Sequence, residues 1–191
     1  MRVLNNQSYK LGNIERYFTG KMVLIFLLLS VAVYLYMNMV SMPRIAAFSQ
    51  DMLMLDLKSE GYDYAYVKNL LDVLGEQGRS AYLFPQLILD MFFPLVYVPF
   101  FVLLIGYFLK KGRLSGTVHK FSLLIPILTG LADYGENTAS ILLIHSYPHI
   151  SEGMVQFASV CTVVKSIGLV ISLLLVVFYG VLSLFYRRNR R

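Results

Sequence analysis

Three acidic residues and one lysine interrupt stretches of sequence that are otherwise apolar. They are Asp90, Asp133, Glu136 and Lys165. Each stretch is long enough to cross a lipid bilayer, where an unpaired charge near the centre costs about 2.5–3.5 kcal/mol. We therefore expect these side chains to face inward and to pair. Lys165 can neutralise one of the three carboxylates and Arg79 a second, so at least one of the acids is expected to hold a proton at neutral pH.

A neutral carboxylic acid beside an ionised carboxylate is used by acid–base catalysis, by proton coupling and by metal binding. We predict that Asp133 and Glu136 act as acid and base. Asp90 would assist them or set their charge, and Lys165 would be their counter-ion. Other polar and aromatic side chains lie at helical spacing or at a similar depth. Those predicted to hold the polar group of a substrate are Asn137, Gln86, Tyr97, Tyr82, Arg79 and Asn38.

A divalent cation is an alternative ligand for the same region. Carboxylate and amide oxygens suit Mg²⁺, Mn²⁺ or Ca²⁺. Such an ion would use Asp90, Asp133, Glu136 and Asn137. The residues alone do not decide whether the protein has a cofactor.

Four apolar segments must position these residues, at about 21–41, 82–109, 121–147 and 154–186. The chain has 191 residues, 57% of them hydrophobic, and a mean hydropathy of +0.62. This composition excludes an ordinary soluble domain. About twenty apolar residues cross a bilayer as a helix, and the runs are continuous rather than alternating, which argues against a barrel. We predict an all-α fold, an integral membrane four-helix bundle forming a single membrane domain over the whole chain.

The connection at 42–81 is predicted to form a short amphipathic helical cap on the outer side. Asp63 is a suitable N-cap for a helix that ends at Gly75. The stretch FSQDMLMLDLKSEG, which ends at Gly61, is predicted to form another short amphipathic helix.

The net charge of +6 is distributed unevenly between the two sides of the predicted bundle. The basic residues of one side are Arg2, Lys10, Arg16, Lys21, Lys110, Lys111, Arg113, Lys120, Arg187, Arg188, Arg190 and Arg191. The acids of the other side are Asp51, Asp56, Glu60, Asp63, Asp72, Glu76 and Glu152. This bias predicts a multi-pass protein of a bacterial cytoplasmic membrane, with both termini in the cytoplasm, and no nucleic-acid partner. The buried acids then fall in the outer half of the bilayer.

Three short motifs resemble those of a family of small four-helix integral membrane proteins. The resemblance covers roughly residues 60–170 and follows the patterns LGxxGR…Y, DxxxPxxY and DxxEN. The matching residues are Gly75, Gly78, Arg79 and Tyr82; Asp90, Pro94 and Tyr97; and Asp133, Glu136 and Asn137. The resemblance implies the four-helix fold and a site at these residues, and it implies no particular reaction.

Three classes of function are compatible with this pattern. The first is a protein that binds or transforms a lipid or isoprenoid by acid–base chemistry, with membrane lipids as its partners. The second is a proton- or cation-coupled carrier, and a homo-oligomer is compatible with it. The third is a membrane assembly or scaffold subunit, in which the polar groups only hold the helices in one register.

Overall fold

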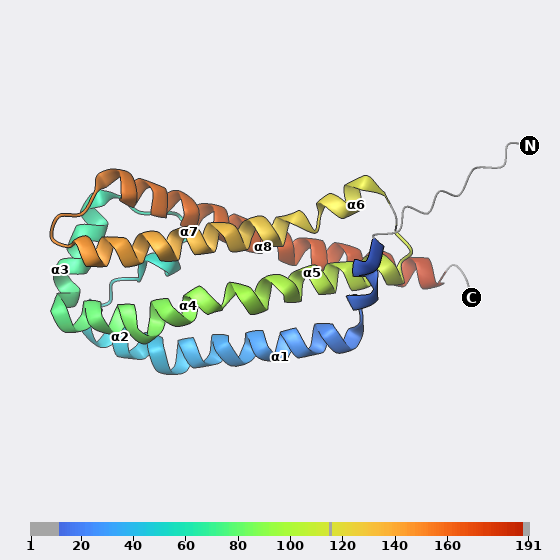
Figure 1. Cartoon of the computed structure of the whole chain (residues 1–191), viewed down its shortest axis with the longest axis horizontal. Helices are drawn as coiled ribbons and strands as arrows, with labels where there is room; N and C mark the ends of the chain where they lie inside the picture. The colour runs from blue at the N-terminus through green and yellow to red at the C-terminus, as the bar shows by residue number, and fades with distance from the viewer. Residues whose placement is uncertain (1–11, 115, 189–191) are drawn as a thin grey trace, which may run out of the picture.

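The computed structural model describes residues 12–114 and 116–188, and the described residues contain helices but no strand (Figure 1). The basic residues Arg2, Lys10, Arg190 and Arg191 lie outside them. The helices are η1 (Gly12–Tyr17), α1 (Gly20–Tyr36), η2 (Met37–Ser41), α2 (Met42–Ser49), η3 (Leu55–Leu57), α3 (Tyr64–Ala81), η4 (Tyr82–Leu87), α4 (Ile88–Phe92), α5 (Pro94–Lys111), α6 (Thr117–Phe121), α7 (Leu124–Ser146) and α8 (Glu152–Arg188).

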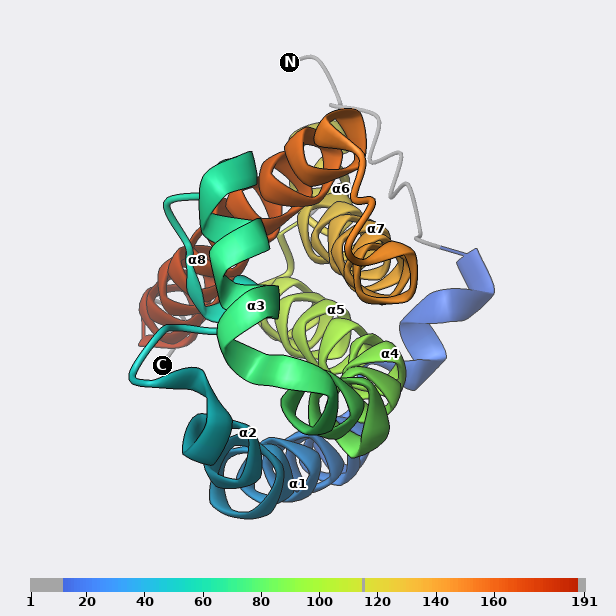
Figure 2. The same cartoon turned by 90° about the vertical axis from the view of Figure 1, so that its left-hand side faces the viewer.

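Four long helical segments lie side by side along the long axis of the molecule. They are α1, the pair α4 and α5, α7, and α8 (Figure 1). α7 packs against both α8 and α5, and α1 packs against α5. α3 crosses one end of these segments, as Figure 2 shows, and η1 and the last turns of α8 lie at the other end. The segments therefore have a covered end, under α3, and an opposite end.

Within residues 12–114 and 116–188, three helices are long and apolar enough to cross a membrane. They are Gly20–Ser49, Tyr64–Lys111 and Glu152–Tyr186. α7, the third of the four predicted spans, has 23 residues but does not meet the same standard of apolarity. The physical reason is its buried face, which carries Asp133 and Glu136.

The first two apolar segments extend further than the hydrophobic runs predicted. The first continues through the π-helix η2 and ends at Ser49 because Gln50 adopts a left-handed conformation (φ 48°). The second is continuous with α3 and contains two backbone breaks. One is at Gly75 (φ 59°), where the sequence predicted a helix end, and the other is at Phe84 (φ −136°, ψ 123°).

The predicted cap is confirmed in one part and wrong in the other. Asp63 caps α3 as expected, because its side chain accepts a hydrogen bond of 2.7 Å from the Tyr66 amide. The second amphipathic helix is wrong: residues 50–63, here called the cap loop, contain only the single turn η3. Left-handed backbone at Gln50 and Asp51 interrupts helix formation at the start of this loop.

The cap loop packs onto the helices through buried apolar residues. Leu55 of the loop lies fully buried in one hydrophobic cluster with Leu70 and Leu71 of α3 and Leu143 of α7. Fully burying each such side chain contributes about 1.5–3 kcal/mol. The covered end is therefore a packed layer over the polar residues beneath it.

Candidate functional site

Lys165 of α8 lies between the two carboxylates of α7. Its Nζ is 3.4 Å from Asp133 Oδ1 and forms a second ion pair with Glu136 Oε2. The three side chains are 9%, 3% and 0% exposed. We call these residues the lysine site. A close approach of the helices makes it compact, because a Cβ at Gly135 would lie 2.9 Å from Cys161 Sγ.

Each carboxylate of the lysine site has further hydrogen-bond donors. The Tyr97 hydroxyl of α5 donates to Asp133 Oδ2 at 2.9 Å, and Asn137 Nδ2 donates to Asp133 Oδ1 at 3.3 Å. The Thr162 hydroxyl donates to Glu136 Oε1 at 2.7 Å. These hydrogen bonds fix the positions of both carboxylates. The Tyr97 and Thr162 hydroxyls can either donate or accept, so each can also bond to a protonated carboxyl group.

A second group of buried polar side chains lies between the α4 region and α7. Gln86 and Asn137 are 0% exposed and Asp90 is 5% exposed. Both side-chain polar atoms of Gln86, Asp90 Oδ2 and Asn137 Oδ1 have no hydrogen-bond partner in the protein. We call these three residues the amide site. Since buried polar atoms are nearly always hydrogen-bonded, such a concentration of unpaired ones requires an explanation.

Two residues of the cap loop, Asp56 and Tyr62, lie beside the site, and the sequence analysis missed both. The Tyr82 hydroxyl donates to Asp56 Oδ1 at 3.2 Å and accepts from the Leu55 amide at 3.2 Å. The Tyr62 amide donates to Ser159 Oγ at 2.8 Å. The Tyr62 hydroxyl in turn lies 3.2 Å from that of Thr162 on α8, the residue bonded to Glu136 in the lysine site.

The pKa values of two cap-loop side chains are shifted by their surroundings. Loss of contact with water raises the pKa of Asp56, and the Lys165 ammonium opposes this rise. Loss of contact with water likewise raises the pKa of Tyr62. Asp56 therefore adds a carboxylate above the lysine site, held by the Tyr82 hydroxyl. Asp56 lies in the stretch for which the sequence predicted a second amphipathic helix, and it was given no part in the site.

Two predicted site residues lie elsewhere. Arg79 donates to the backbone oxygen of Leu71 at 2.7 Å, and its guanidinium lies 4.3 Å from the centre of the Tyr147 ring. Asn38 is exposed and donates to the backbone oxygen of Tyr34 at 2.9 Å. Both side chains use local partners near the covered end. The remaining predicted residues lie in or directly beside the two sites.

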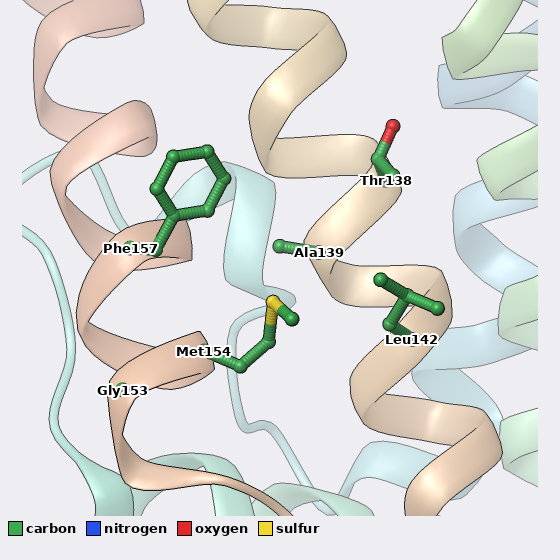
Figure 3. A pocket seen from close by; sticks show the side chains of 6 residues that line it. All are labelled: Thr138, Ala139, Leu142, Gly153, Met154 and Phe157. Carbon is green, nitrogen blue, oxygen red and sulfur yellow. The ribbon is translucent and has the colours of Figure 1, made fainter.

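Two surface grooves lie near the covered end. The first, called the α7–α8 groove, has a volume of about 300 Å³ and opens between those helices (Figure 3). Its walls are apolar apart from one threonine, and its lining residues are Thr138, Ala139, Leu142, Gly153, Met154 and Phe157. The second, of about 440 Å³, is lined by the end of α2 and the cap loop, and Asn38 belongs to its lining.

The predicted divalent-cation set is divided between the two sites. Asp133 and Glu136 are paired with Lys165, whereas Asp90 and Asn137 have unpaired oxygens. Within residues 12–114 and 116–188, no group of three or more histidine, cysteine, aspartate or glutamate side chains is arranged to hold a metal ion. Any cation here would therefore depend on amide oxygens as well as carboxylates.

No known protein family, curated protein or solved structure matches this chain. The resemblance to small four-helix membrane proteins remains a prediction from the motif residues. The function must therefore be inferred from the geometry of the lysine site, the amide site and the grooves beside them.

Proposed function

We propose that the chain is an integral membrane protein whose four long helical segments cross the bilayer as a bundle, with α3 and the cap loop on the outer side. Its surface supports this proposal, because large apolar side chains of α1 and α8 are exposed while the polar ones are buried. Leu28 is 60% exposed and Leu174 is 62% exposed, whereas Glu136 is 0% exposed. Water would penalise such an arrangement, and lipid would favour it.

We infer that the protein binds or transforms a membrane lipid by acid–base chemistry at the lysine site. The observation that carries this proposal is the position of the α7–α8 groove. It opens between the same two helices that hold Lys165 against Asp133 and Glu136, and its lining residue Ala139 lies one turn from Glu136. An acyl or isoprenoid chain in the groove would lie about one helical turn from the buried Glu136.

The lysine site has the parts that proton transfer needs. One ammonium contacts two carboxylates, so one of them can hold or release a proton while the other stays paired with Lys165. Tyr97 and Thr162 orient one carboxylate each. In this proposal Asp133 and Glu136 act as acid and base, and the amide site holds the polar head group.

A proton- or cation-coupled carrier is the second candidate. The break at Phe84 supports it, because membrane carriers commonly build their ion sites where a spanning helix is interrupted. Gln86, two residues further on, has both polar side-chain atoms unpaired. A carrier needs access to the site from both sides of the membrane, whereas a lipid-binding protein needs it only from the bilayer.

Native mass spectrometry of gently purified protein tests the lipid proposal. The variant Asp133→Asn/Glu136→Gln removes both charges while keeping side-chain size. The matched control is Asp72→Asn/Glu76→Gln, which makes the same chemical changes on the exposed face of α3. Asp72 Oδ1 accepts a hydrogen bond from the Tyr147 hydroxyl, and the asparagine oxygen can still accept it. We expect a specific lipid to co-purify with the wild type and the control but not with the site variant.

A second variant tests the groove separately. A Cβ at Gly153 would meet only Ser151 Oγ, at 3.9 Å, so Gly153→Phe can fill the α7–α8 groove without a backbone clash. Loss of the lipid in this variant, with an unchanged melting temperature, would place the lipid chain in the groove. If lipid retention were equal in all four proteins, the lipid proposal would be wrong.

A further inference from the structure

The amide site combines a single carboxylate with two amide oxygens. Gln86 Oε1, Asp90 Oδ2 and Asn137 Oδ1 are all buried, and none has a donor in the protein. Leaving a buried acceptor unsatisfied costs about 1–3 kcal/mol. Three such atoms in one region of a folded protein indicate that something other than the protein satisfies them.

The backbone brings these oxygens to one place. Gln86 and Asp90 are four residues apart, so they lie on the same helical face. Both η4 and α4 contact α7, which carries Asn137. Asn137 also donates through Nδ2 to Asp133, and this bond holds its oxygen away from the lysine site.

Two irregularities of the second long segment add backbone acceptors at the same level. Pro94 has no amide hydrogen, so the carbonyl oxygen of Asp90 loses its usual helical donor. Phe84 leaves the helical conformation two residues before Gln86. Interrupted membrane helices offer backbone carbonyl oxygens to alkali cations in this way.

The charge of the amide site points to a monovalent ion. Carboxylate, amide and carbonyl oxygens are the ligands of hard cations. Lys165 pairs with Asp133 and Glu136, and Asp56 accepts a hydrogen bond from Tyr82, whereas Asp90 Oδ2 has no partner and is available for a bound ion. One carboxylate balances one positive charge.

We infer that Gln86, Asp90 and Asn137 form a binding site for a monovalent alkali cation. Water that hydrates the ion would accept a hydrogen bond from Gln86 Nε2, the one unpaired donor of the site. This inference does not depend on the lipid proposal, and it would supply the ion for the carrier described as the second candidate.

Thermal unfolding at constant ionic strength tests the inference, with NaCl, KCl and N-methyl-D-glucamine chloride as the three salts. We expect the wild type to melt at a higher temperature in one alkali salt, with a saturable concentration dependence. The variant Asp90→Asn should weaken the apparent affinity by at least about 10-fold, the lower end of what supporting metal-site residues contribute. The lysine-site variant Glu136→Gln leaves the bond between Asn137 and Asp133 in place, so it should keep the ion dependence, which separates this test from that of the lipid proposal.

Direct binding of radioactive Na⁺ and Rb⁺ to the wild type by equilibrium dialysis keeps the test valid if Asp90→Asn does not fold. Gln86→Leu offers a second, uncharged change at the same site. Saturable binding that Gln86→Leu weakens would support the inference. Equal melting temperatures in the three salts together with no retained ion would overturn it, and would show that the amide site holds water alone.

Discussion

Replacing Lys165 by methionine tests whether the lysine site is a true buried ion pair. The substitution keeps an unbranched side chain, one atom shorter, and removes the charge that contacts Asp133 and Glu136. Removing one partner of a buried pair costs about 3–5 kcal/mol, because the remaining charge is left uncompensated. In a chain of this size 1 kcal/mol corresponds to about 2–4 °C, so Lys165→Met should lower the melting temperature by roughly 6–20 °C.

The assay is circular dichroism at 222 nm on protein in nanodiscs of one composition. The triple variant Lys165→Met/Asp133→Asn/Glu136→Gln should recover most of the loss, because it removes the unpaired charges together with their partner. Lys58→Met is the matched control. Lys58 pairs with Glu60 at 2.6 Å on the exposed cap loop, where an ion pair contributes little to stability.

Two results would refute this reasoning. The first is a melting temperature for Lys165→Met no lower than that of Lys58→Met. The second is a triple variant that unfolds at a temperature as low as that of Lys165→Met or lower. Either would mean that the carboxylates of α7 are not held in place by the lysine charge.

Two further predictions concern the cap loop. Because folding raises the pKa of Asp56, the folded chain binds more protons than the unfolded chain at pH values between the unfolded and folded pKa. The stabilisation present at acid pH is therefore lost as the pH rises through the raised pKa. Melting curves from about pH 4 to about pH 8 should show a melting temperature that falls with pH, and this fall should be shallower in Asp56→Asn. Gly61→Ala should destabilise more than Gly75→Ala, although both glycines have positive φ, because a Cβ at Gly61 would lie 2.8 Å from Ser159 Oγ while one at Gly75 meets nothing within 4 Å. Melting temperatures and proteolysis of the cap loop measure the difference, and equal effects of the two alanines would contradict the docking of the loop on α8.

Much of the helical framework could be predicted from the sequence. Continuous apolar runs specify helices because backbone groups in an apolar environment must be satisfied within the same segment. The run 121–147 corresponds to α7 and the run 154–186 to α8, each within a few residues. The pairing of Lys165 with the acids of α7 followed from the same physics, since isolated charges are too costly in these helices.

The cap loop could not be predicted in the same way. Asp56 is one of several acids in a polar connection, and no spacing or periodicity distinguishes it from Glu60. Its place near the lysine site depends on its contact with Tyr82, a residue 26 positions away in the chain. Such contacts form between segments distant in sequence, so a local pattern does not contain them. Arg79 is the opposite case, a residue that the sequence placed in the site and the structure does not. Its helical spacing predicted a place beside Asp90, but its guanidinium stacks on the Tyr147 ring instead.

The pattern of satisfied and unsatisfied polar atoms argues against a purely structural role for the buried residues. A group that only fixes helix register performs best when every polar atom has a partner, because a partly satisfied network is less stable than an apolar core. The lysine site meets this condition only when its ion pairs are counted, because Glu136 Oε2 has Lys165 as its ion-pair partner and no hydrogen bond. The amide site, one turn away, does not, and proteins usually retain such local losses of stability where they bind or react. A scaffold would need only a site in which polar atoms are partnered, like the lysine site. The unpartnered atoms of the amide site favour a protein that uses this region to bind a ligand.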